Sequence, residues 1–396
     1  MGNTNKENII QANLEYVRIV RKFKSLYENK EIEDFSNIIG REQFTTYLNA
    51  KKALDKKAKK AKENYDYAYK VYQQYQEAKS SLKKYFPNYK YSEIKLNNIK
   101  ITNPELTSDV EFMKQFLKYG ESDQSLTKQM KEFDDLLFKR VNIDFNERTI
   151  LNEDTDRLSD IGYGNNILNN NLNEYSHGTK IAGLIIGDNI KIMPLCVSPY
   201  GNEHDKDIAI AIRYAVDNGA KVINMSFSKN FSLFKEWVLD AIKYADNKNV
   251  LIVTSAGNDG LNINNRDNYP DDANGSGIEV SNNFLKIGAT TYFVNSDLID
   301  KYSNYGNSKV DVFAPGVDIY TAIPNNKYAY FSGTSLAAAL TSKVAALIFS
   351  YYPNLSASQV KHIIMDSGVE YTFPVKTPTK EDKDKMTPFN ELSKSR

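Results

Sequence analysis

The chain has 396 residues, with 51 basic and 50 acidic side chains that leave a formal net charge of +1. This balance provides no overall polycation and argues against nucleic acid as a partner. The length suggests two or three domains. A single cysteine, Cys196, excludes an internal disulfide and is expected to be a buried core residue.

Residues 1–141 carry a helical pattern. Between 43 and 86, alanine, leucine and tyrosine side chains recur three or four residues apart, close to the repeat of a coiled coil, which predicts one long helix. Similar stripes lie in 9–27 and 109–141, and an antiparallel helical hairpin with a short third helix would bury all three. The segment 87–104 breaks the pattern and is expected to form the tip or a connector.

Seven lysines gather between residues 51 and 62. They indicate either an anionic partner or an ordinary solvated helix face, because nearby acidic side chains offset part of the charge. Heparin binding that is lost when these lysines are replaced by alanine would favour the partner.

From residue 191 onward, predicted strands alternate with predicted helices. Strands are expected over 191–197, 221–227, 250–254 and 285–289, and helices over 207–218, 233–247, 335–351 and 356–366. Such alternation predicts an α/β fold whose parallel sheet is covered by helices on both faces. The chain then becomes polar, and 371–396 is expected to be a disordered tail.

Three short motifs supply the groups that acyl transfer needs, namely a nucleophile, a general base and a donor for the oxyanion. Ser335 lies in a Gly-Thr-Ser motif at the expected start of a helix, where unpaired N–H groups favour negative charge. His177 lies in a His-Gly-Thr motif, and it is the preferred base because His204 and His362 are expected at the surface. Asn258 follows a buried strand and can donate from its side-chain amide.

These motifs, in the order His-Gly-Thr, Ala-Gly-Asn and Gly-Thr-Ser, resemble those of the subtilisin-like serine proteases, or subtilases. The resemblance runs from about residue 149 to about residue 367. It implies a subtilisin-like parallel sheet and a serine endopeptidase acting on a polypeptide substrate. By position, His177 would be the base, Ser335 the nucleophile and Asn258 the oxyanion donor. No cofactor, metal or membrane-spanning segment is expected.

The resemblance also implies a substrate cleft. One segment would pair with the substrate backbone as an added strand, and it consists of Ser226, Phe227 and Ser228. A second segment would line the primary pocket, and it consists of Ser255, Ala256 and Gly257. Four positions depart from the family pattern. Lys180 stands where His is usual and Ser228 where Gly is usual, and Ala339 and Lys343 stand where Pro and Gly are usual.

The triad carboxylate has no clear match. Subtilases place it before the histidine, at the end of an apolar strand of the form Val-x-Val-Ile-Asp-Ser/Thr-Gly, whereas the similar stretch 149–156 puts polar residues into that strand. Some bacterial subtilases carry a long lysine- and tyrosine-rich helical insertion after the acid strand, and 1–141 resembles it. We therefore expect the acid strand to be absent and to come from an upstream fragment. A carboxylate from Asp154, Asp156 or Asp160 is the alternative.

Loss of the triad carboxylate costs about 10⁴-fold in turnover. The expected function is therefore that of a subtilisin-type serine endopeptidase with impaired activity. The alternative is an inactive pseudoprotease that binds peptides or serves as a scaffold through its helical region. Dinucleotide, P-loop, zinc and α/β-hydrolase sites do not fit, because their motifs or their chain order are missing.

The resulting domain plan is a helical, coiled-coil-like region over 1–145, a peptidase domain over 146–370 and the tail over 371–396. Members of the resembling family are typically secreted or attached to the cell surface. The start of this chain lacks the apolar core of a secretory signal, which taken literally indicates a cytoplasmic protein.

Overall fold

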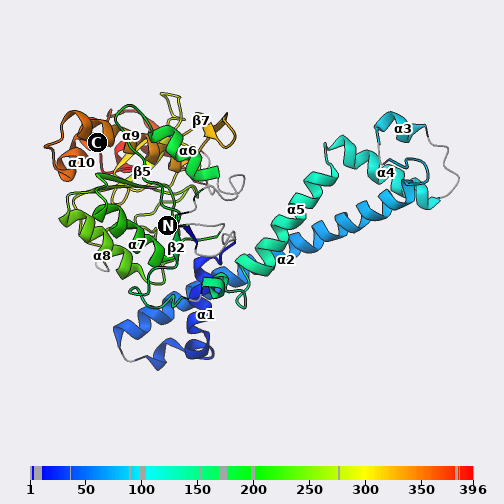
Figure 1. The fold of residues 1–396 in the computed structure, drawn as a ribbon, viewed down its shortest axis with the longest axis horizontal. Coiled ribbons are helices and arrows are strands. Elements are labelled where there is room, and N and C mark those ends of the chain that lie inside the picture. Colours follow the sequence, from blue (N-terminus) through cyan, green and yellow to red (C-terminus); the bar gives the residue numbers. More distant parts are fainter. Residues whose placement is uncertain are drawn as a thin grey trace. The chain divides into compact units, whose positions relative to one another are not determined.

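The computed structural model describes residues 2–3, 11–35, 37–88, 91–98, 104–151, 153–166, 168, 176–197, 201–274, 277–379, 382 and 384–395. The chain forms two compact units: a helical unit, Gln11–Glu147, and a sheet unit that combines Met1–Ile10 with Arg148–Arg396 (Figure 1). The helical unit therefore ends two residues after the expected boundary between 145 and 146, and Met1–Ile10, expected in the helical region, belongs to the sheet unit.

The helical unit is built on one long helix, α2 (Ile38–Leu82). The other helices are α1 (Glu15–Tyr27), α3 (Glu93–Asn97), α4 (Pro104–Lys118) and α5 (Asp123–Asp135). α1, α4 and α5 all pack against α2 (Figure 1). The long helix and its helical partners are therefore as predicted, except that the third stripe is divided: α4 ends before Gly120, which has a φ of +71°, and a capping box at Ser122 starts α5.

The sheet unit contains four parallel strands in the order β3 (Val222–Met225), β4 (Leu251–Ser255), β5 (Phe284–Thr290) and β6 (Val312–Pro315). α7 (Asp205–Asp217) and α8 (Lys235–Asn247) cover one face, and α9 (Thr334–Tyr351) and α10 (Ala357–Asp366) cover the other (Figure 1). Successive side chains of β4 alternate between the two cores, Leu251 and Val253 toward α9 and α10 and Ile252 toward α7 and α8. The predicted α/β fold is thus confirmed.

Smaller elements complete the sheet unit. α6 (Ser176–Ile185) packs against α9 and against an antiparallel hairpin of β7 (Ile319–Ile323) and β8 (Lys327–Phe331). β1 (Gly2–Asn3) pairs with β2 (Gly164–Asn165). Among the described helices, α9 is long and apolar enough to cross a membrane by length and composition alone. It packs against all four parallel strands, as a core helix does.

The segment 191–197 is not the expected strand. It has no assigned secondary structure, and Cys196 is exposed rather than buried. An apolar run becomes a buried strand only when a neighbouring strand pairs with it, and the described residues provide none.

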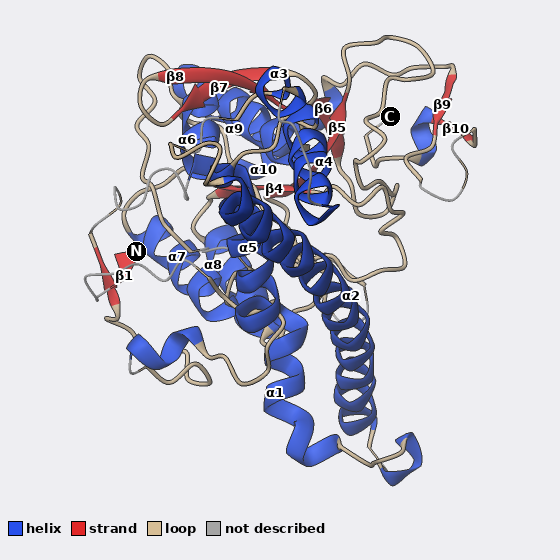
Figure 2. Cartoon of the chain, turned by 90° about the vertical axis from the view of Figure 1, so that its right-hand side faces the viewer, coloured by secondary structure: helices blue, strands red, loops and turns tan. Residues whose placement is uncertain are grey.

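The tail 371–396 is ordered over its described residues rather than disordered. β9 (Pro374–Lys376) and β10 (Met386–Pro388) form a small antiparallel pair (Figure 2). Val375, Phe389 and Leu392 are buried in one apolar cluster with Leu298 and Ile299. Polar residues separate these three buried side chains in the sequence, so the segment is polar on average and its sequence does not indicate that it packs against the sheet unit.

Candidate active site

α6 presents His177 near the start of α9. His177 is the second residue of α6, and its side chain is exposed. Ile181 and Leu184 of the same helix pack against Leu336 and Ala339 of α9. Because the two side chains on each helix are three residues apart, they form one contact face per helix and fix the two helix starts near each other.

Ser335 is the second residue of α9 and is 8% exposed. Gly333 precedes the helix with a φ of +148°, a conformation that favours glycine. Its N–H donates to the carbonyl oxygen of Gly316 at 2.7 Å. This turn places the serine hydroxyl in the first helical turn, where the unpaired N–H groups and the macrodipole stabilise nearby negative charge.

The carbonyl oxygen of Ser226 joins the two predicted catalytic residues. It lies 3.1 Å from His177 Nε2, and it accepts a hydrogen bond from Ser335 Oγ at 3.0 Å. The Ser226 hydroxyl in turn donates to the Ser335 carbonyl oxygen at 2.8 Å. The two motifs therefore meet at the carboxyl end of β3, although no hydrogen bond links His177 to Ser335 directly within the described chain.

The side chain of Asn258 is oriented by Thr334. Its Oδ1 accepts hydrogen bonds from the Thr334 N–H at 2.8 Å and from the Thr334 hydroxyl at 3.1 Å. The same hydroxyl accepts from the N–H of Gly257 at 3.1 Å, and Thr334 is fully buried. Asn258 is exposed, and no hydrogen bond within the described chain occupies its Nδ2. The amide N–H groups are thus left for an external acceptor.

The two predicted substrate segments lie side by side. Residues 226–228 follow β3 and residues 255–257 end β4, the neighbouring parallel strand. Gly257 has a φ of +100°, and a Cβ at this position would lie only 2.7 Å from Ser228 Oγ. The close approach requires glycine at 257, and it brings Ser228 against the loop that carries Asn258.

The departures from the family pattern are accommodated by local contacts. Lys180 lies over the ring of Phe331, with Nζ 3.8 Å from the ring centroid. Lys343 points away from the core and donates to the Ile186 carbonyl at 3.1 Å, just beyond the end of α6, where a cation is favourable. Ala339 is buried against α6. Lys180 and Lys343 therefore attach α6 to β8 and α9, and Ala339 packs between α9 and α6.

The three alternative carboxylates lie elsewhere. Lys206 Nζ is 2.8 Å from the Asp154 carbonyl oxygen and 4.0 Å from Asp160 Oδ2. The Asp156 N–H donates to Asp154 Oδ1 at 3.0 Å. None of the three carboxylates hydrogen-bonds to His177, whose Nδ1 has no partner among the residues that the structure describes.

The outer edge of β3 has no pairing strand in the described part of the chain. One side of β3 pairs with β4, and no strand in the described ranges pairs with the other side. The stretch that begins at 149 enters as a 3-10 turn, Glu147–Leu151, rather than as a strand. An edge of this kind presents unpaired N–H and C=O groups and serves as a template for a further strand.

Comparison with known families identifies the chain. A model of the Subtilase family, peptidase S8, matches residues 56–389, which is more than half of the sequence. The chain belongs to the subtilase family. The His-Gly-Thr, Ala-Gly-Asn and Gly-Thr-Ser motifs all lie within the matched range.

Several curated peptidases are similar to this subtilase. It is 32% identical over 218 residues to the cell wall-associated protease of Bacillus subtilis (strain 168), covering 52% of the chain and 22% of that protein. It is 34% identical over 190 residues to the thermophilic serine proteinase of Bacillus sp. (strain AK1), covering 44% and 43%. With thermitase of Thermoactinomyces vulgaris it shares 33% identity over 209 residues, covering 50% and 68%. The chain thus spans less than half of the length of the first two relatives.

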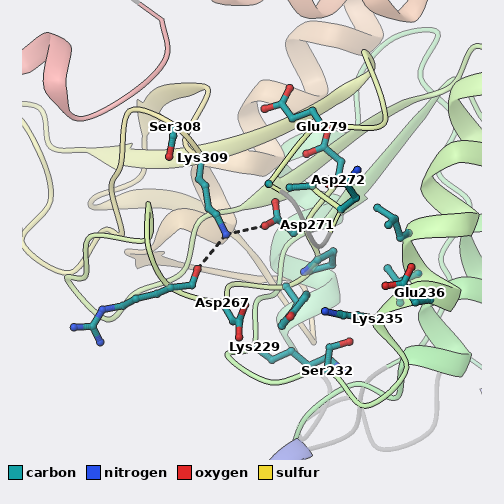
Figure 3. Close-up of a pocket in the computed structure, with 18 of the residues that line it drawn as sticks. Lys229, Ser232, Lys235, Glu236, Asp267, Asp271, Asp272, Glu279, Ser308 and Lys309 are labelled. Atoms are coloured by element: carbon teal, nitrogen blue, oxygen red, sulfur yellow. Dashed lines mark hydrogen bonds and ion pairs between the residues drawn. The ribbon is translucent and has the colours of Figure 1, made fainter. Parts of the chain in front are cut away.

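The subtilase also contains a charged cavity of about 380 Å³ (Figure 3). Burial opposes ionisation of Asp271, but Lys286 and Lys309, at 3.2 and 3.0 Å, outweigh it and lower the pKa of this carboxyl. The adjacent Asp272 is 4% exposed, and its Oδ2 has no hydrogen-bond partner in the described structure. Burial, reinforced by Glu279 and other nearby acidic groups, raises the pKa of Asp272 to about 7.

Replacing Asp272 with Asn should stabilise the protein at pH 8. Folding raises the pKa of Asp272 from about 4 to about 7. The unfolded chain therefore ionises first as the pH rises, and stability falls between these values and stays low above them. Urea unfolding should show D272N to be more stable than wild type by up to about 4 kcal/mol at pH 8, with the gain fading towards pH 4.

The neighbouring Asp271 provides the matched control for this measurement. Asp271→Asn should destabilise the protein at pH 8, because it deprives the buried Lys286 of its carboxylate partner. Equal pH dependence of unfolding in D272N and wild type would contradict the assignment of a raised pKa to Asp272.

Sequence reasoning gave no role to Thr334, although it stands inside the Gly-Thr-Ser motif. Its hydroxyl links Gly257 and Asn258, residues far away in the sequence. The only available signal was the choice of threonine directly before the proposed nucleophile, and threonine is also an ordinary helix-start residue.

Proposed function

We propose that this subtilase is a serine endopeptidase, with Ser335 as nucleophile, His177 as general base and Asn258 as oxyanion donor. The observation that carries the proposal is the shared contact of Ser335 Oγ and His177 Nε2 with the Ser226 carbonyl oxygen. Ser335 Oγ would attack the substrate carbonyl carbon while its proton passes to His177 Nε2. The proton would then go to the leaving amine, and water would hydrolyse the acyl-enzyme.

The proton position on His177 explains why a carboxylate is needed. A contact between Nε2 and a carbonyl oxygen requires Nε2 to carry the proton, because the carbonyl can only accept. A neutral imidazole in this tautomer has no lone pair on Nε2 to take the proton of Ser335. A carboxylate beside Nδ1 would hold the proton there and free Nε2 as the acceptor.

We further propose that a strand added at the open edge of β3 supplies this carboxylate. The carboxyl ends of parallel strands meet at the same edge of a sheet. β3 runs into Ser226, whose carbonyl contacts His177. A strand parallel to β3 that ends in aspartate would therefore bring its side chain to the His177 end of the sheet. Such a strand would come from an upstream fragment or a separate polypeptide.

Labelling with a fluorophosphonate tests the proposed nucleophile. The Ser335 oxygen displaces fluoride from phosphorus and loses its proton, which leaves a stable covalent adduct. Wild type should be labelled slowly and Ser335→Ala not at all. Ser332→Ala, an exposed serine three residues away, should be labelled like wild type. Labelling that persists in S335A would refute the assignment, and labelling as fast as in an intact subtilase would refute the need for an added carboxylate.

The alternative of an inactive scaffold is not favoured. The curated relatives reported above are named as proteases, and the contacts of Ser335 and His177 support a site for the same chemistry.

A further inference from the structure

Asn304 is a fully buried amide in the loop between β5 and β6. Its Nδ2 donates to the Ala256 carbonyl oxygen at 2.8 Å. Its Oδ1 accepts from the backbone N–H groups of Asp259 at 3.2 Å and Leu261 at 3.0 Å. Its own backbone N–H donates to the Gly257 carbonyl oxygen at 2.9 Å. One residue thus makes four hydrogen bonds to the segment 256–261.

These bonds bracket Asn258. Gly257 and Asp259 are its immediate neighbours in the chain, and Asn304 holds both. Thr334 holds the side-chain oxygen of Asn258, but in the described structure it makes no hydrogen bond to the backbone that follows Asn258, from Asp259 onward. A shift of about 1 Å in a catalytic group costs about 10²-fold in rate, so the loop needs a second attachment.

We propose that Asn304 is a positioning residue, which holds the loop 256–261 so that Asn258 Nδ2 meets the oxyanion on the Ser335 adduct. The inference rests on the proposed function of these two residues. It predicts that loss of the Asn304 side chain weakens binding of a tetrahedral adduct more than binding of the uncleaved peptide, because Asn304 also contacts the pocket residue Ala256.

Asn283 offers a matched control, because it bonds the chain at the start of β4 whereas Asn304 bonds it at the end of β4. It is also a buried asparagine, and its Nδ2 donates to the Val250 carbonyl oxygen at 2.9 Å, just before β4. Asn304 bonds the segment just after β4. Replacement of either residue removes a buried amide, and the loss of Asn304 should cost more stability because its side chain makes three hydrogen bonds against one from Asn283. Only Asn304 contacts the loop that carries Asn258.

The experiment compares two ligands on the full chain. One is an N-acetylated tripeptide boronic acid with an apolar terminal side chain, and the other is the same tripeptide as a carboxamide. Ser335 Oγ bonds to boron and its proton goes to solvent, which gives a tetrahedral anion, whereas the carboxamide only occupies the cleft. The covalent bond to boron is the same in every variant that keeps Ser335, so the change in the affinity ratio between such variants reports the change in stabilisation of the tetrahedral adduct.

Asn304→Ala should lower this ratio by about 10²-fold, as loss of an oxyanion donor does, and Asn283→Ala should leave it unchanged. If N304A does not fold, Asn304→Ser is judged by the same ratio, because its short hydroxyl cannot reach all three partners. A ratio in N304A or N304S equal to that of N283A overturns the inference alone. A boronic acid that binds wild type and Ser335→Ala equally well overturns the proposed function and the inference with it.

Discussion

A peptide of the pattern Val-x-Val-Ile-Asp-Ser/Thr-Gly should raise the rate at which Ser335 reacts with a fluorophosphonate by about 10⁴-fold. The outer edge of β3 has unpaired backbone groups in the described structure, and an extended apolar peptide can pair with them. A hydrogen bond from His177 Nε2 to the Ser226 carbonyl oxygen would place the proton of a neutral imidazole on Nε2. A carboxylate at the end of the added strand would move this proton to Nδ1 and let Nε2 accept from Ser335.

The matched control is the same peptide with Asn in place of Asp. It can pair with β3 equally well, but its neutral amide cannot stabilise an imidazolium. Its NH₂ group can also donate to His177 Nδ1, which keeps the histidine proton on Nε2. Both peptides should therefore bind with similar affinity, measured by calorimetry, and only the Asp peptide should accelerate labelling. Equal acceleration by the two peptides, or binding of the Asp peptide without acceleration, would count against a role for the added carboxylate.

The helices and the covered strands could be predicted because their signals are local. The spacing of Tyr75, Ala78 and Leu82 shows one apolar face of α2, and these side chains are buried in the helical unit. The continuous apolar run of β4 is buried on both faces in the same way. The segment 191–197 is also largely apolar but forms no strand in the described structure, because a strand needs a neighbour that its own residues do not specify.

The candidate site could be predicted only as far as its motifs extend. Ser335 and His177 follow from short motifs, and the structure brings both to Ser226. The roles of Lys343 and Asn304 depend instead on contacts with residues more than 40 positions away, such as the bond from Lys343 to Ile186. In the sequence Lys343 is visible only as a departure from the family pattern, whereas in the structure its ammonium group contacts the end of α6.

Replacing Asn258 should lower kcat by about 10²- to 10³-fold while KM stays unchanged, because its Nδ2 meets the oxyanion only in the transition state. Hydrolysis of an activated peptide ester measures both constants. Asn258→Ala has a second effect, since it also leaves the buried Thr334 N–H and hydroxyl without their acceptor, at a cost of about 1–3 kcal/mol in stability.

Asn258→Asp separates the two effects. The aspartate keeps an acceptor for Thr334 and so should preserve the melting temperature, but it has no N–H to donate and its charge repels the oxyanion. Its kcat should therefore fall at least as far as that of N258A. Asn265→Ala, an exposed residue of the following loop, should leave both constants unchanged. Wild-type kcat in N258D would mean that other donors at the start of α9 stabilise the oxyanion. A rise in KM without a fall in kcat would make Asn258 a substrate-binding residue.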